Sequence, residues 1–207
     1  MRWSRTPIAI NTQKGLFIPF VLAVGVFLCG LVLGAISLRT LNPLVQQELN
    51  QYLTFYLKEV SACAGGSLSI KAWVQTLKIQ ACSLGLLWVF GLTIVGSPLI
   101  LIAVAARGFI VGFTVGFLVQ EEAGKGLILA IAGVLPQNLC YIPAFLGAGV
   151  LSLYFSFTLL RTQDAPYRRL GVYTLLFLVF FLLVLIGSWL EAYLAPGLMR
   201  LILPILK

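Results

Sequence analysis

Residues 84–160 form an apolar stretch that is far too long for the core of a soluble domain. Charged side chains interrupt it only at Arg107 and in the segment 121–125, and a polar stop follows at residues 135–138. A bilayer core is about 30 Å thick and a helix rises about 1.5 Å per residue, so about 20 apolar residues cross it once. The stretch therefore predicts several consecutive membrane crossings.

The composition of the whole chain supports the same class. Hydrophobic residues make up 60% of the 207 residues and charged residues only 10%, whereas charged residues reach about 25% in globular proteins. We predict an all-α, polytopic membrane helix bundle that forms one integral membrane domain over residues 1–207. The net charge of +8 comes from basic residues beside apolar segments, where they anchor helices, so no nucleic-acid partner is expected.

The first 15 residues carry three basic side chains and no acid, and residues 16–38 follow without a charge. The apolar core of a cleaved signal peptide has about 7–15 residues, so this longer run predicts a retained first span. We predict that residues 1–15 lie in the cytoplasm. Gly30 and Gly34 form a GxxxG pair, which favours close packing of this span against another helix.

The only substantial polar segment, residues 39–81, is expected outside the cell. Asn42 and Pro43 form a typical helix start, and apolar residues then recur at helical spacing opposite glutamines and asparagines. This pattern is typical of a connector that lies on the membrane surface, or of a surface that docks a partner. The docking candidates are Tyr52, Leu53, Tyr56 and Leu57.

A second span is expected from residue 81, with a kink or break at Gly96-Ser97-Pro98. Gly108, Gly112 and Gly116 repeat every four residues and therefore share one helix face, which favours close packing. Arg107 has two interpretations. It lies at a tight turn on the cytoplasmic side between two spans, or it is a buried anchor for a polar cluster and has a polar partner.

Residues 126–160 are 35 positions without a charge, more than one straight span needs. We predict a broken or re-entrant element here, with a polar cluster formed by Arg107, Pro136, Gln137 and Asn138. Gln137 and Asn138 either satisfy carbonyls exposed at the break or help to form a solute or ion site. A last span at 170–190 brings the expected total to about five.

The sequence offers little for catalysis. There is no histidine, the four cysteines match no metal or redox spacing, and Asp164 is the only aspartate. Glu121 and Glu122 are adjacent, so on a helix they point about 100° apart and do not converge. We predict no catalytic residues, no metal and no cofactor, and therefore no enzyme. A scaffold and a small-solute transporter or channel are the two remaining classes, and the second lacks obvious inverted repeats.

Three motifs in order suggest a family. They are GLLWVFGLTIVGSP at residues 85–98, RGFIVGFTVGFL at 107–118 and LPQN with a following IPA at 135–144. This set resembles the stage II sporulation protein M family over residues 84–160. The resemblance implies a non-enzymatic scaffold of the sporulation engulfment complex, placed in the septal membrane of a sporulating bacterium. Its implied partners are the lipid bilayer and the peptidoglycan hydrolases called stage II sporulation proteins D and P, and a homo-oligomer is left open.

Overall fold

Every regular element in the described part of the chain is a helix, which confirms the predicted all-α class. The computed structural model describes residues 9–62, 66–93, 95–161 and 167–206, without the side chains of some residues near these ends and of residues 121–125. The elements are α1 (Ala9–Ser37), the 3₁₀-helix η1 (Leu38–Thr40), α2 (Pro43–Ala62), α3 (Gly66–Gly91), α4 (Gly96–Gly133), α5 (Leu135–Arg161), α6 (Tyr167–Trp189), the π-helix η2 (Leu190–Leu194) and α7 (Ala195–Leu206).

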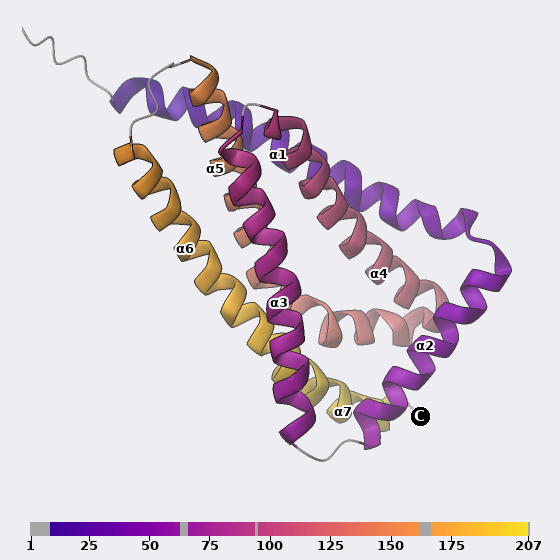
Figure 1. Cartoon of the computed structure of the whole chain (residues 1–207). Coiled ribbons are helices and arrows are strands. Elements are labelled where there is room, and N and C mark those ends of the chain that lie inside the picture. The colour runs from indigo at the N-terminus through magenta and orange to yellow at the C-terminus, as the bar shows by residue number, and fades with distance from the viewer. Residues whose placement is uncertain (1–8, 63–65, 94, 162–166, 207) are drawn as a thin grey trace, which may run out of the picture.

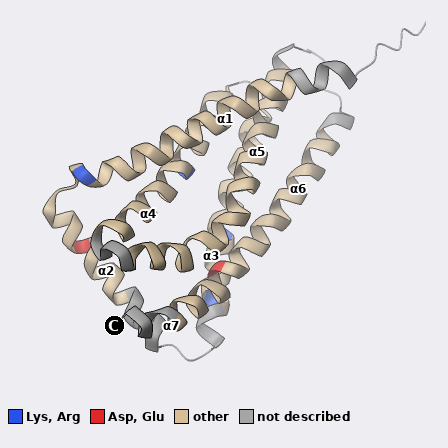
Figure 2. Ribbon diagram, turned by 180° about the vertical axis from the view of Figure 1, so that it is seen from behind, with Lys and Arg blue, Asp and Glu red and all other residues tan. Residues whose placement is uncertain are grey.

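Four segments of the described chain are long and apolar enough to cross a membrane. They are Gly15–Thr40, Gly96–Gln120, Leu135–Leu159 and Leu170–Met199. Figure 2 shows that most of the described length of these helices carries no charge. The chain is therefore a multi-pass membrane protein.

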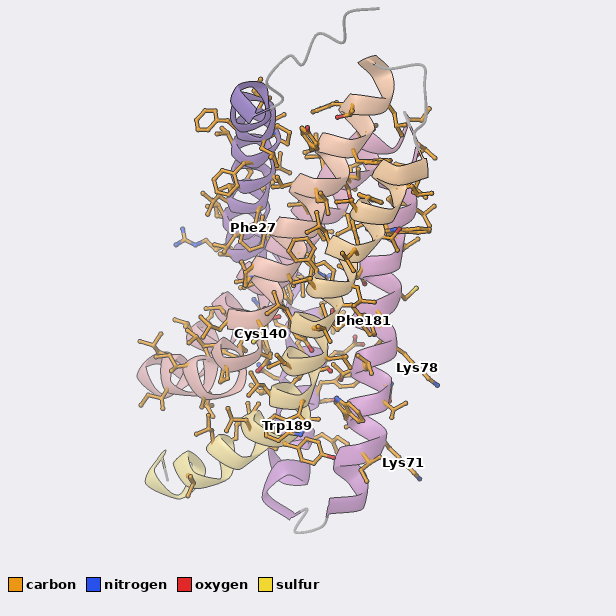
Figure 3. All side chains as sticks on the ribbon, turned by 90° about the vertical axis from the view of Figure 1, so that its left-hand side faces the viewer. Phe27, Lys71, Lys78, Cys140, Phe181 and Trp189 are labelled. Atoms are coloured by element: carbon orange, nitrogen blue, oxygen red, sulfur yellow. The ribbon has the colours of Figure 1, made fainter. Side chains whose placement is uncertain are left out.

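The fifth expected span falls within α3, which does not meet the same hydropathy criterion. Lys71 and Lys78 lie on this helix, are exposed and point outward from it (Figure 3). They lower its mean hydropathy, although α3 is long enough to cross a bilayer and its C-terminal half packs into the core. Four segments of the structure are therefore candidate spans by composition. The helix α3 is a further long helix that packs within the bundle.

The helices form two groups (Figure 1). In one, α1 packs along the first part of α4; in the other, α3, α5 and α6 pack together. The buried core joins them through residues of α3, α4, α5 and α6, including Leu87, Ile100, Val104, Leu153 and Val184. The helix α2 runs from the end of α1 toward α7 at one end of the bundle.

Glycines determine how closely α1 and α4 approach. A Cβ built at Gly30 would lie 2.2 Å from the carbonyl oxygen of Ala105, and one built at Gly112 would lie 2.0 Å from that of Leu31. Gly34 and Gly108 make equivalent contacts with the facing backbone. Gly116 lies beside Leu38 at the end of the same interface. The five glycines singled out by their spacing thus lie where these two helices touch, and four of them contact backbone directly.

The structure has a break next to the predicted position Gly96-Ser97-Pro98, and it corrects one interpretation of Arg107. The chain turns between α3 and α4 at residues 92–95, directly before Gly96 and Pro98. Arg107 instead lies in the middle of the Gly96–Gln120 span. The interpretation of Arg107 as an interfacial residue at a turn is therefore wrong. Pro98 lies in the first turn of α4, where its missing N–H costs no hydrogen bond.

The predicted irregularity near residues 126–160 takes the form of a bend and a break. A Cβ built at Gly126 would lie 1.8 Å from the carbonyl oxygen of Leu118, so α4 bends sharply between these residues. Its last part then runs across the bundle toward α5 (Figure 1). The break lies at Val134, and α5 continues as one span with Pro136 in its first turn.

The start of α2 agrees with the sequence prediction. The helix begins at Pro43, and the side-chain oxygen of Asn42 accepts a hydrogen bond of 3.3 Å from the Leu44 amide. The cytoplasmic and external positions of residues 1–15 and 39–81 remain predictions, and residues 1–8 lie outside the described part of the chain.

Candidate functional site

Arg107 is held by side chains from two neighbouring helices. Its Nη2 donates a hydrogen bond to Oε1 of Gln80, a buried residue of α3. Its guanidinium also lies over the ring of Phe145 on α5, 3.9 Å from the ring centroid. A cation over an aromatic face is attracted by the negative potential of the ring, most strongly where water is excluded. The charge of Arg107 is therefore stabilised within the span.

A carboxylate completes this group. The hydroxyl of the buried Tyr141, on α5, donates a 2.8 Å hydrogen bond to Oε2 of Glu191. Arg107 lies close enough to Tyr141 and Glu191 to interact with both electrostatically. We call Gln80, Arg107, Tyr141 and Glu191 the buried polar cluster. In this cluster Arg107 is hydrogen-bonded to Gln80, and Tyr141 is hydrogen-bonded to Glu191.

Local backbone features bring these residues together. Glu191 lies in η2, the π-helix between α6 and α7, and such π-helical turns are frequent at functional sites. Tyr141 packs its ring on Gly187, where a Cβ would lie 2.6 Å from the ring. A larger residue at position 187 would displace the ring, so this glycine allows the phenol to reach Glu191.

The buried polar cluster links α3, α4, α5 and η2. An arginine in the middle of a transmembrane helix costs about 2.5–3.5 kcal/mol on insertion scales, and such residues are retained where they have partners and a function. Arg107 thus lies inside the bundle, as the buried-anchor interpretation expects. Its partners are Gln80, Phe145 and Glu191, and not the predicted members of the cluster near Pro136. We infer that the cluster fixes the relative position of four elements.

Gln137 and Asn138, predicted in the same cluster as Arg107, make other contacts. Gln137 donates from Nε2 to the carbonyl of Gly133 at 2.6 Å, and Asn138 donates from Nδ2 to that of Val134 at 2.8 Å. Both carbonyls lie at the break that precedes Pro136. These side chains thus satisfy backbone acceptors at the break, which is one of the two roles that the sequence left open.

A second set of polar contacts closes the end of α3. The last carbonyls of a helix have no partner within it, and within a membrane they need one. The hydroxyl of Tyr173 on α6 donates to the carbonyl of Trp88, and Ser152 on α5 donates to that of Leu87, both at 2.9 Å. Ser156 donates to the carbonyl of Thr93 in the following turn, also at 2.9 Å.

Replacing Tyr173 with phenylalanine is expected to destabilise the protein by about 1–3 kcal/mol, because the carbonyl of Trp88 loses its donor in a buried position. The measurement is the free energy of unfolding in mild detergent. Tyr193→Phe is the matched control, because Tyr193 is exposed and its described contact is with the ring of Trp189. Equal stability of the two variants would contradict the assigned role of the Tyr173 hydroxyl.

The predicted docking residues lie on α2. Tyr52 is 77% exposed and Phe55, which the sequence analysis did not single out, is 61% exposed. Leu53 is half-buried. The side chains of Tyr56 and Leu57 lie outside the described residues.

Sequence reasoning missed the partners of Arg107. Glu191 was read as the end of the last span, although an isolated acid in an apolar segment was a usable signal for a partner of Arg107. Gln80 and Tyr141 carried no comparable signal. Within the described chain, no three His, Cys, Asp or Glu residues gather to form a metal-binding group.

The chain was compared with models of protein families. The model described as stage II sporulation protein M matches residues 23–196, well over half of the chain. No curated protein and no solved structure matches it. The matched range includes all four members of the buried polar cluster and the glycine contact between α1 and α4.

Proposed function

The chain belongs to the stage II sporulation protein M family, and on this basis we propose that it is a non-enzymatic membrane scaffold of the sporulation engulfment complex. In this proposal it recruits the peptidoglycan hydrolases, stage II sporulation proteins D and P, to the septal membrane. The family match supports a sporulation-related membrane protein. The docking role is supported by the surface of α2.

The observation that carries the docking proposal is an exposed apolar face on α2. Leu44, Tyr52 and Phe55 are strongly exposed, and at 100° per residue they fall within about 80° of the helix circumference. Large exposed aromatic residues are enriched in the anchor positions of protein interfaces. Because α2 is not among the candidate spans, this face is available at one end of the bundle.

Aromatic residues also anchor helices in the lipid headgroup region, which is the role expected of a surface-lying connector. The two roles differ in what they predict. A connector loses membrane contact when its face becomes charged, whereas a docking face loses its protein partner while the four spans keep the chain in the membrane.

The transport alternative receives less support. A solute site at the broken helix would need several free polar groups. The amide nitrogens of Gln137 and Asn138 already bind backbone carbonyls, and among the described residues the Gln137 side-chain oxygen is the one buried side-chain polar atom without a hydrogen-bond partner. The adjoining hollow is lined almost wholly by apolar residues. These contacts favour a scaffold.

The docking proposal is tested with the double variant Tyr52→Asp/Phe55→Asp. We expect recovery of stage II sporulation proteins D and P with the purified chain to fall by about tenfold or more, because two aromatic anchors of the proposed interface are replaced by charges. The measurement is quantitative co-purification from sporulating cells in mild detergent.

The control is Gln46→Asp, a partly exposed position of the same helix about 120° from Tyr52 and about 180° from Phe55 around its axis. It should leave co-purification unchanged. Unchanged recovery of both hydrolases with the double variant, at equal membrane levels, would exclude α2 as the docking surface.

A further inference from the structure

An apolar hollow of about 540 Å³ lies between the two parts of α4 and the start of α5. Val115 lines it from the first part of α4, Ala130 and Ile131 from the last part, and Leu139 and Ile142 from α5. The bend of α4 at Gly126 and the break at Val134 create this space, because they turn the last part of the helix away from its first part. The hollow is therefore a consequence of the irregular backbone.

Water is a poor occupant of this hollow. A buried water needs two to four polar partners, and Asn138 is the only polar residue among the described residues of the lining. The side-chain nitrogen of Asn138 already donates to the carbonyl of Val134. The same lack of partners excludes a small polar solute.

A complete helix is too large. A helix about 10–12 Å in diameter rises about 5.4 Å per turn, so a single turn fills about 500 Å³, which is nearly the whole hollow. A transmembrane helix has five or more turns. A partner span could at most cover the opening of the hollow.

An unfilled apolar hollow would also be unfavourable, since its lining atoms would lose their dispersion contacts. The hollow lies at one end of two candidate spans, and its rim residues Leu135 and Leu139 are 56% and 74% exposed. Both the interior of the hollow and its opening are therefore apolar. A slender apolar ligand can enter from the side.

We propose that this hollow is a binding site for one acyl chain of a bilayer phospholipid. Lipid tails are as apolar as leucine, so entry from the bilayer brings no hydrophobic gain, and retention depends on the fit of the chain between α4 and α5. The acyl chain fills the space that the bend of α4 opens. This site is independent of the scaffold function, because its residues are separate from the exposed face of α2.

The first test maps lipid contacts on the unmodified protein. The chain is reconstituted in liposomes of phosphatidylglycerol and phosphatidylethanolamine with a trace of phosphatidylglycerol that carries a photoactivatable diazirine in its acyl chain. Cross-linking to residues 127–142 is expected to exceed cross-linking to residues 172–182 of α6 by about tenfold, the ratio for 1.4 kcal/mol of preferential binding. The α6 segment is the internal control, because Val172 and Leu175 are as exposed as Leu135 but are not among the lining residues of this hollow. Equal labelling of the two segments would overturn the proposal.

The second test fills the hollow. Ala130→Phe and Ile131→Trp each place a ring in the lining, and native mass spectrometry then measures the phospholipid retained by the detergent-extracted protein. We expect about one retained phospholipid per unmodified chain, a loss of about tenfold in either variant and no loss in Val172→Phe. No retained phospholipid on the folded, unmodified chain, full retention by both variants, or a polypeptide held at residues 127–142 in place of lipid would each refute the acyl-chain site.

Discussion

Replacing Gly112 with leucine is expected to remove most of the folded protein from the membrane. A Cβ at this position would lie 2.0 Å from the carbonyl oxygen of Leu31 and 2.8 Å from its carbon, and both are backbone atoms that cannot rotate away. The helices α1 and α4 would have to separate along the whole contact that Gly30, Gly34 and Gly108 share. Overpacking costs about 1–3 kcal/mol where side chains can shift, and the cost should exceed that range here.

The control for this experiment is Gly25→Leu. Gly25 lies on α1, but a Cβ built there meets nothing within 4 Å, so the variant adds the same side chain without a clash. The measurements are the amount of protein in the membrane fraction and the free energy of unfolding in mild detergent. If Gly112→Leu accumulated and unfolded like Gly25→Leu, the close contact of α1 with α4 would be refuted.

The parts of the fold that could be predicted from the sequence depend on local patterns. The helices follow from apolar runs that only a membrane can accept, and the start of α2 follows from Asn42 and Pro43. The spacing of Gly108, Gly112 and Gly116 showed that they share a face. It did not show that the facing helix is α1, because spacing within one helix contains no information about its neighbour.

The parts that could not be predicted depend on distant residues. The contact of Gln80 with Arg107 joins positions 27 apart in sequence, and that of Tyr141 with Glu191 joins positions 50 apart. The break before Gly96 was expected from Pro98, but the second turn that one interpretation placed at Arg107 is not formed, because α4 continues through that residue. A charge ends a span only when it lacks a partner within the bundle, and the partner is visible only in three dimensions.

The buried polar cluster and the glycine contact have complementary roles in this arrangement. Glycine packing holds α1 against α4, whereas the polar cluster holds α4 against α3, α5 and η2. Small residues and interhelical hydrogen bonds are the two means by which membrane helices associate, because apolar burial gives little preference for protein over lipid. The helix α4 depends on both, and together with the direct packing of α1 on α5 it joins the two helix groups.

The second large effect is expected at Arg107. Replacing it with methionine removes the hydrogen bond to Gln80, the contact with Phe145 and the positive charge that attracts Glu191. The lost hydrogen bond in a buried position costs about 1–3 kcal/mol, and the lost cation–π contact costs about 2 kcal/mol where water is excluded. We therefore expect Arg107→Met to lower the free energy of unfolding in mild detergent by about 3–5 kcal/mol. Arg39→Met is the control, because Arg39 is exposed in η1, and its effect should stay within about 0.5 kcal/mol.

A double-mutant cycle with Glu191→Gln separates the charge interaction from the other contacts. Glutamine keeps an acceptor for the Tyr141 hydroxyl but has no charge, so the double variant Arg107→Met/Glu191→Gln contains neither uncompensated ion. Its destabilisation should be smaller than the sum of the two single effects by about 1–3 kcal/mol, the range found for residues of one polar network. Strict additivity would mean that Arg107 and Glu191 do not stabilise one another, and the four residues would then be two separate pairs, Arg107 with Gln80 and Tyr141 with Glu191.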